Sequence, residues 1–226
     1  MNLYVDTATS HRWNFPRGGV TPPDEGQPHM VRLAFLLEKP DGTTIREACH
    51  LIRMPQGERM NSEAAHHLGL YDHHLQERGK AIADGLTELA EVLGEVQLGL
   101  CMGDAGCVIA HSWAFHRQVL ERSFRYVGMP AREWPPAVCA MISATNIVQI
   151  PKNQPGGGWK WPDFNQCCER FVGSPLRPTM DPVADGIARV RAVRIFWSNI
   201  RRHQEMSIER QGPKGSAPRG SQDPSQ

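Results

Sequence analysis

Two apolar stretches joined by a short turn constrain the fold of this 226-residue chain more than any other feature. The first covers residues 30–38, the second covers residues 43–53, and Pro40-Asp41-Gly42 lies between them. A Pro-Asp-Gly sequence between two stretches of β type is typical of a hairpin turn, so we predict two antiparallel strands. Residues 2–6 predict a further strand beside this hairpin, and it carries Asp6 at its C-terminal end.

Helical patterns follow the hairpin. Apolar residues recur on one helical face between Ile82 and Leu93, which predicts a helix over 79–93. The remaining predicted elements are helices over 62–68, 113–127, 162–171 and 182–202, a strand over 106–111, and a short strand or turn over 137–141. Strands that alternate with helices after a hairpin predict an α/β fold, in which helices flank a mixed sheet of antiparallel and parallel strands.

Two segments have the composition of irregular structure. Residues 10–29 are dense in proline and glycine, which predicts a long loop. Residues 203–226 are rich in Gly, Ser, Pro, Gln and mixed charges, which predicts a disordered tail. We therefore expect one domain over 1–202, followed by that tail.

Charge and cysteine content exclude several classes of protein. The formal net charge is +1, so binding of a polyanion requires a local basic patch. The chain has six cysteines and none forms a C-x-x-C pair, which favours free thiols in a reducing, cytoplasmic compartment. No apolar run approaches the roughly 18 residues that span a bilayer, so we expect no membrane partner.

Four short segments point to a family. They are Val5-Asp6-Thr7-Ala8-Thr9, the segment 108–116 (Val-Ile-Ala-His-Ser-Trp-Ala-Phe-His), Cys139-Ala140-Met141 followed by Lys160-Trp161-Pro162, and the segment 180–185 (Met-Asp-Pro-Val-Ala-Asp). In order and spacing they resemble the D-T-E-T, V-A-H-N-x-x-F-D, C-T-M…K-x-P-x-L and H-x-x-x-x-D motifs of the DnaQ-like (DEDDh) 3′→5′ exonucleases. The resemblance covers about residues 2–202 and implies a ribonuclease-H-like fold.

The resemblance also implies a particular chemistry. In that family four carboxylates hold two divalent ions, which activate a water and stabilise the leaving 3′ oxygen. Mg²⁺ and Mn²⁺ suit such oxygen ligands. A histidine five residues before the last aspartate serves as the general base.

Transferred residue by residue, the match is incomplete. Asp6 takes the position of the first aspartate and Asp185 that of the last. Ala8 stands at the glutamate position, His116 at the middle aspartate and Met180 at the general base. Three of the five catalytic positions are therefore replaced.

Three functions remain open at this point. The first is an exonuclease relative that engages nucleic-acid 3′ ends with impaired or absent catalysis. The second is an active exonuclease with a rearranged site of Asp6, Asp185, Asp181 and His116, which holds Mg²⁺ or Mn²⁺. The third is a scaffold that binds a protein partner and needs no metal.

The resemblance places aromatic and basic residues near a nucleic-acid cleft. Aromatic rings stack on unpaired bases and lysine meets phosphates, so the expected contacts are Trp113, Phe115, Lys160 and Trp161. The expected ligand is a single strand or its 3′ end. The alternative for Trp161 is a place in the core. A row of arginines on the last predicted helix offers phosphate contacts or simply a solvated face: Arg189, Arg191, Arg194, Arg201 and Arg202.

Overall fold

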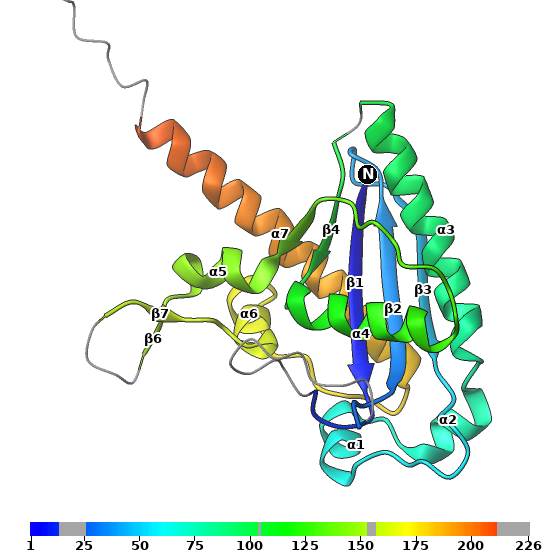
Figure 1. Ribbon diagram of the computed structural model, residues 1–226. Helices are drawn as coiled ribbons and strands as arrows, with labels where there is room; N and C mark the ends of the chain where they lie inside the picture. The colour runs from blue at the N-terminus through cyan, green and yellow to red at the C-terminus, as the bar shows by residue number, and fades with distance from the viewer. Residues whose placement is uncertain (14–25, 104, 153–156, 212–226) are drawn as a thin grey trace, which may run out of the picture.

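A five-stranded mixed sheet forms the centre of the molecule (Figure 1). The computed structural model describes residues 1–13, 26–103, 105–152 and 157–211. The strands lie in the order β3-β2-β1-β4-β5, with β1 and β2 antiparallel, β2 and β3 antiparallel, and the other two pairs parallel. Their bounds are β1 Asn2–Thr9, β2 Met30–Glu38, β3 Thr44–Leu51, β4 Cys107–Ala110 and β5 Ala137–Cys139. The predicted hairpin and its neighbouring first strand are confirmed.

Helices cover both faces of this sheet (Figure 1). Their bounds are α1 Ser62–Leu68, α2 Asp72–Arg78, α3 Ile82–Cys101, α4 Trp113–Tyr126, α5 Ala140–Val148, α6 Phe164–Phe171 and α7 Pro182–Gln211. A small two-stranded hairpin, β6 Ile150–Pro151 with β7 Trp159–Lys160, stands apart from the main sheet. The predicted α/β fold with a mixed sheet is confirmed. In the described part of the chain no helix is long and apolar enough to cross a membrane.

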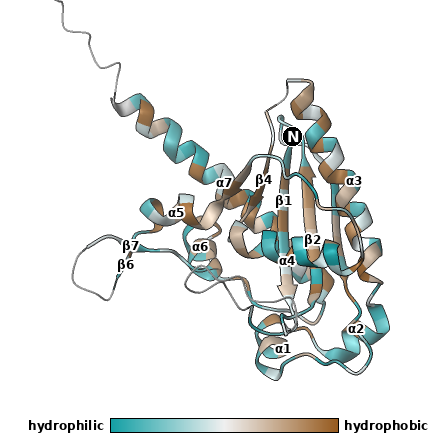
Figure 2. Ribbon diagram, in the orientation of Figure 1, coloured by the Kyte–Doolittle hydropathy of each residue, from teal (hydrophilic) through white to brown (hydrophobic). Residues whose placement is uncertain are grey.

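Alternation along β1 divides the core into two layers. Leu3 and Val5 pack with α3 and α4 on one face, whereas Tyr4 packs with α5, α6 and α7 on the other. Because successive side chains of a strand alternate, Asp6 lies on the same face as Tyr4, beneath α7. The central strands are hydrophobic, whereas the outer part of α7 is mostly hydrophilic (Figure 2).

Several sequence predictions need correction. Helices α2 and α5 were not predicted, and the helix expected over 79–93 begins at Ile82 and extends to Cys101. The tail expected to be disordered from residue 203 is helical as far as Gln211. No glycine or proline interrupts 187–211, so α7 continues on backbone hydrogen bonds after its burial ends. Residues 14–25 of the expected loop and 212–226 of the expected tail lie outside the described residues.

Gly186 allows α7 to lie close to the sheet. A Cβ at this position would lie 2.4 Å from Cys49 Sγ, 3.1 Å from Arg32 Cδ and 3.4 Å from Ala34 Cβ. The absence of a side chain at Gly186 therefore allows α7 to approach strands β2 and β3 closely. This approach also brings the α7 side chain of Arg189 to Asp6.

Gly186→Ala is expected to lower the free energy of unfolding by about 1–3 kcal/mol, because the new methyl overpacks the contact with β2 and β3. The matched control is Gly94→Ala in α3, where a Cβ would meet nothing within 4 Å. There the substitution is expected to stabilise the protein by about 0.5–1 kcal/mol, as alanine does in an open helix position. Urea denaturation of both variants measures the difference, and equal effects would contradict the close packing at Gly186.

Candidate functional site

The candidate site is built at the C-terminal end of β1. In the register between β1 and β2, Asp6 is opposite Ala34 and Ala8 is opposite Arg32. Directly opposed residues of antiparallel strands project to the same face of the sheet. Arg32 therefore lies across from the position at which the resemblance places a glutamate. Asp6 and Ala8 of β1, with their partners Ala34 and Arg32 of β2, form the part of the sheet that lies beneath α7.

Asp6 is buried in a cluster of cations. Its Oδ2 accepts a hydrogen bond of 2.9 Å from Arg189 Nε and lies 3.7 Å from Arg32 Nη2. The side chains of Asp6 and Arg32 are 1% and 2% exposed. Burial raises the pKa of Asp6, but the neighbouring Arg189, together with His116 and Arg32, outweighs it and holds the pKa below its usual range. The carboxylate is therefore ionised and paired through Oδ2, whereas its buried Oδ1 has no hydrogen-bond partner among the described residues.

Both arginines are fixed by further contacts. Arg189 Cζ lies 3.8 Å from the ring centroid of Phe164, a cation–π contact that holds the guanidinium above Asp6. Arg32 Nη1 donates to the carbonyl oxygen of Pro182, 3.4 Å away, at the start of α7. Arg189 is one helical turn beyond Asp185, so α7 brings both residues to the same side of the helix. The two guanidiniums are held in place by both the sheet and the helices.

His116 reaches the same carboxylate from α4. Its Nε2 lies 4.0 Å from Asp6 Oδ1, and its Nδ1 accepts a 3.0 Å hydrogen bond from the backbone N–H of Thr7. Because Nδ1 accepts, the neutral ring carries its proton on Nε2, which faces Asp6. Burial lowers the pKa of His116 to about 4, against the opposing pull of Asp6. His116 is therefore neutral at neutral pH, and its Nε2 lies too far from Asp6 Oδ1 to donate a hydrogen bond.

Stability is expected to fall as the pH drops from about 6.5 to about 4. In the folded chain burial lowers the pKa of both His116 and His111 to about 4, so in that window the unfolded chain binds more protons. Each histidine contributes a loss on the order of 1 kcal/mol at pH 5.5. Urea denaturation across this pH range, with His116→Gln as the comparison, measures the effect. A slope that His116→Gln leaves unchanged would contradict it.

The remaining carboxylates hold the loop before α7. Asp185 is 8% exposed, and its two oxygens accept from the backbone N–H of Thr179, with the Thr179 hydroxyl 2.8 Å from Oδ1. Asp181 caps α7, because its Oδ1 accepts from the N–H of Val183, and it also pairs with Arg78 at 3.0 Å. Met180 is 93% exposed. The Asp181 carboxylate is thus engaged by α7 and Arg78, and it does not contribute to the cluster around Asp6.

These residues do not fit a divalent metal ion. Two guanidiniums already neutralise Asp6, and His116 turns its protonated nitrogen toward that carboxylate. A divalent ion there would meet two fixed positive charges at short range. Within the described ranges, no group of three or more His, Cys, Asp or Glu side chains is arranged to hold a metal. Asp6 and His116 come together as expected, but with arginines where cations would bind.

A cavity of about 470 Å³ lies against this cluster. It opens between β2, α1, α6 and α7, and the loop before α7 forms its rim. Its lining residues are Arg32, His67, Leu68, Asp163, Phe164, Asn165, Leu176, Arg177, Pro178, Asp185, Ala188 and Arg189. Three arginines and two aspartates are among these residues, so the lining carries charges of both signs.

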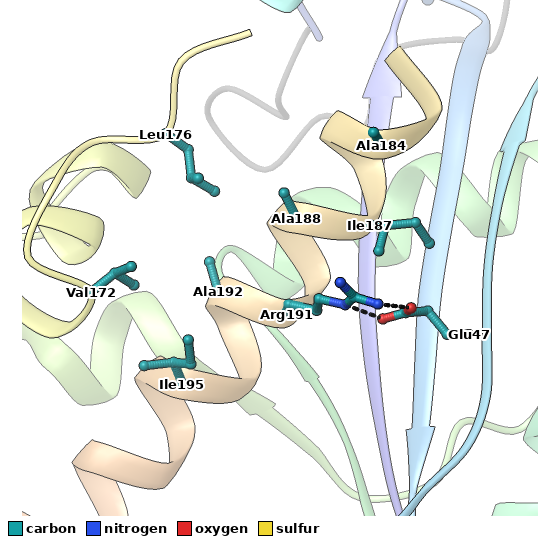
Figure 3. Close-up of a pocket in the computed structure, with 9 residues that line it drawn as sticks. All are labelled: Glu47, Val172, Leu176, Ala184, Ile187, Ala188, Arg191, Ala192 and Ile195. Atoms are coloured by element: carbon teal, nitrogen blue, oxygen red, sulfur yellow. Dashed lines mark hydrogen bonds and ion pairs between the residues drawn. The ribbon is translucent and has the colours of Figure 1, made fainter. Parts of the chain in front are cut away.

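A second, apolar cavity of about 500 Å³ also adjoins α7 (Figure 3). Val172, Leu176, Ile187 and Ile195 are among its lining residues. At its edge Arg191 makes a bidentate ion pair with Glu47 of β3, drawn in Figure 3. Arg191 follows Arg189 by two residues, so the two side chains leave α7 on different faces.

The four expected nucleic-acid contacts separate into two pairs. Trp113 and Phe115 are partly buried and pack against the core of the α3 and α4 layer, Trp113 with its ring 5.2 Å from that of Trp134. Lys160 in β7 is exposed, and the neighbouring Trp161 is 64% exposed rather than in the core. Lys160 and Trp161 are therefore both accessible to solvent.

The fold has known relatives among exonucleases. No protein-family model matches the chain, and no curated protein matches it by sequence. The solved structures it resembles include Escherichia coli exonuclease I in complex with a dT13 oligonucleotide (TM-score 0.64, 10% identity, 92% of this chain and 42% of that one). Another is the nuclease domain of 3′hExo, a DEDDh family member, bound to rAMP (0.56, 13%, 90% and 92%). A third is a 3′-exonuclease with specific recognition of the histone mRNA stem-loop 3′ end (0.55, 13%, 90% and 81%).

The chain therefore has the ribonuclease-H-like fold of the DEDDh exonucleases, as the four motifs predicted. It spans less than half the length of the exonuclease I chain. At these identities the likeness shows the fold, and the site must be interpreted from this chain's own residues.

Sequence reasoning missed Arg32 and gave Arg189 no special place. Arg32 is one charged residue within the otherwise apolar run from Met30 to Leu37. A lone arginine in a buried strand needs a charged partner, and this signal was present in the sequence. The role of Arg189 requires the packing of α7 on the sheet, which no local pattern encodes.

Proposed function

We propose that this protein binds the 3′ end of single-stranded nucleic acid and does not hydrolyse it by the two-metal route. One observation carries the proposal: Asp6, at the position of the first metal ligand, is paired with Arg189 at 2.9 Å and lies 3.7 Å from Arg32. Groups that act as one catalytic unit lose most of their effect when several are replaced. Ala8, His116 and Met180 replace three of them.

The binding part of the proposal is supported by the fold and by one surface. The structures that share the fold hold a dT13 oligonucleotide and rAMP. The exposed Lys160 and Trp161 supply a cation and a stacking ring outside the cavity. Since the net charge is only +1, the affinity should be modest and should fall with added salt.

A comparison of linear and circular strands tests this function. A 5′-labelled linear oligonucleotide and a circle of the same sequence, as DNA and as RNA, are titrated with protein and followed by anisotropy. The linear strand is expected to bind at least about tenfold more tightly, because it alone offers a 3′ end. Gel analysis of the same samples in Mg²⁺ and Mn²⁺ is expected to show no shortening.

Three outcomes would overturn the proposal. Equal binding of circle and linear strand removes the preference for ends. Shortening that Asp6→Asn abolishes shows an active exonuclease with a rearranged site. Failure to bind either strand favours the scaffold function, for which the apolar cavity beside α7 is the candidate surface.

A further inference from the structure

We propose that Arg32 and Arg189 take the place of the two metal ions, so that the cavity beside them binds the phosphate of a terminal nucleotide without any divalent cation. This inference rests on the proposed function, because it names the group that the same site binds. It differs from that function in predicting a phosphate site that is complete in the absence of metal.

Charge balance is the first support. The resemblance implies four carboxylates with two divalent ions, whose formal charges cancel. Here Asp6 and Asp185 lie among Arg32 and Arg189, and these charges also cancel. A phosphate that enters this site therefore meets the same formal charge as in a metal-loaded exonuclease, with N–H donors in place of the ions.

Unused donors are the second support. Arg189 gives its Nε to Asp6, and within the described residues its two Nη groups have no hydrogen-bond acceptor. The Nε of Arg32 is buried and likewise has no partner there. Both side chains line the cavity of about 470 Å³, which lies in the size range of small-ligand sites. Arg189 is 29% exposed, so its unused Nη groups are accessible at the cavity wall, and Arg32 adds a second positive charge to the same lining.

Arg177 provides a third cation on the cavity lining. It is exposed and makes no ion pair within the described part of the chain. The two acidic residues of the lining are both engaged: Asp163 Oδ1 accepts from the N–H of Gln166 as the cap of α6, and Asp185 accepts from Thr179. With both acidic residues engaged, Arg32, Arg177 and Arg189 supply positive charge to the cavity lining.

Isothermal titration of the full chain with thymidine 5′-monophosphate, inorganic phosphate and thymidine tests the inference. The monophosphate is expected to bind with the same affinity, within about twofold, in EDTA and in excess Mg²⁺, and thymidine is expected not to bind. Arg177→Ala is expected to weaken binding by about three- to tenfold. The matched control is Arg202→Ala. Arg202 is an exposed arginine of α7 that does not line the cavity, so its loss should leave binding unchanged.

Arg189→Lys provides a further arm, because it keeps the charge but loses the planar fork. This substitution is expected to lower the affinity for the monophosphate by more than about tenfold. If this variant fails to fold, the comparison of Arg177→Ala with Arg202→Ala decides. Binding that requires Mg²⁺, absence of monophosphate binding, or equal effects of Arg177→Ala and Arg202→Ala would each overturn the inference. If the protein gives any of these results but still prefers linear strands, the metal-free phosphate site is wrong and the proposed function stands.

Discussion

Asp6→Asn is expected to lower the free energy of unfolding by about 3–5 kcal/mol. The carboxylate is 1% exposed and faces Arg189 and Arg32. Asparagine has nearly the same shape but no charge, so it leaves two guanidiniums, one of them fully buried, without the carboxylate that pairs with them. A buried charge deprived of its partner is among the costliest single changes in a protein.

The direction of this effect separates two kinds of site. In a site of clustered carboxylates that awaits metal, loss of one negative charge relieves repulsion and stabilises the metal-free protein. In the present cluster the same substitution removes the attraction that holds β1, β2 and α7 together. Urea denaturation in EDTA measures the sign directly.

The matched control for Asp6→Asn is Glu91→Gln. Glu91 pairs with Arg46 at 3.3 Å, and both side chains are well exposed. Loss of such a surface pair is expected to cost no more than about 1 kcal/mol. An Asp6→Asn protein as stable as wild type, or more stable, would show that Asp6 is not held by the arginines.

Restoration of the family's residues alone is expected to give no exonuclease. The triple variant Ala8→Glu, His116→Asp, Met180→His replaces the lost groups, but Arg32 lies directly opposite position 8 in the register. A carboxylate introduced there pairs with that guanidinium rather than with a metal ion.

Removal of the two guanidiniums in the same background is expected to matter most. Addition of Arg32→Leu and Arg189→Leu to the triple variant should raise Mn²⁺-dependent 3′ trimming by at least about 10²–10³-fold over the triple variant. Initial rates on a labelled single strand measure the gain. A triple variant that is already fully active would contradict the blocking role of the arginines.

More of the fold than of the site could be predicted from the sequence. The hairpin around Pro40-Asp41-Gly42 and helix α1 follow from local patterns, and the structure has both. Helix α2 was missed because only one of its residues, Leu75, is buried, so it carries no apolar periodicity. Helix α5 was missed for a similar reason, since its buried residues are two alanines. Short helices that owe their place to packing leave little trace in the sequence.

Within the site, motif spacing predicted which residues lie close together but not which hydrogen bonds and ion pairs they form. It places Asp6 and His116 together, and the two side chains lie 4.0 Å apart. It does not predict that Thr7 fixes the tautomer of His116 or that Asp181 caps α7 and pairs with Arg78. These details depend on which partner each polar atom meets in three dimensions, and that is decided by the packing of distant segments.

The central claim is that guanidinium groups occupy the place of the metal ions at Asp6. Titration of the native chain with Mn²⁺, followed by the electron paramagnetic resonance signal of the free ion, tests it most directly. The free-ion signal is expected to rise in proportion to added Mn²⁺, with no saturable site that Asp6→Asn removes. One or more tightly bound ions per chain, released by Asp6→Asn, would contradict it.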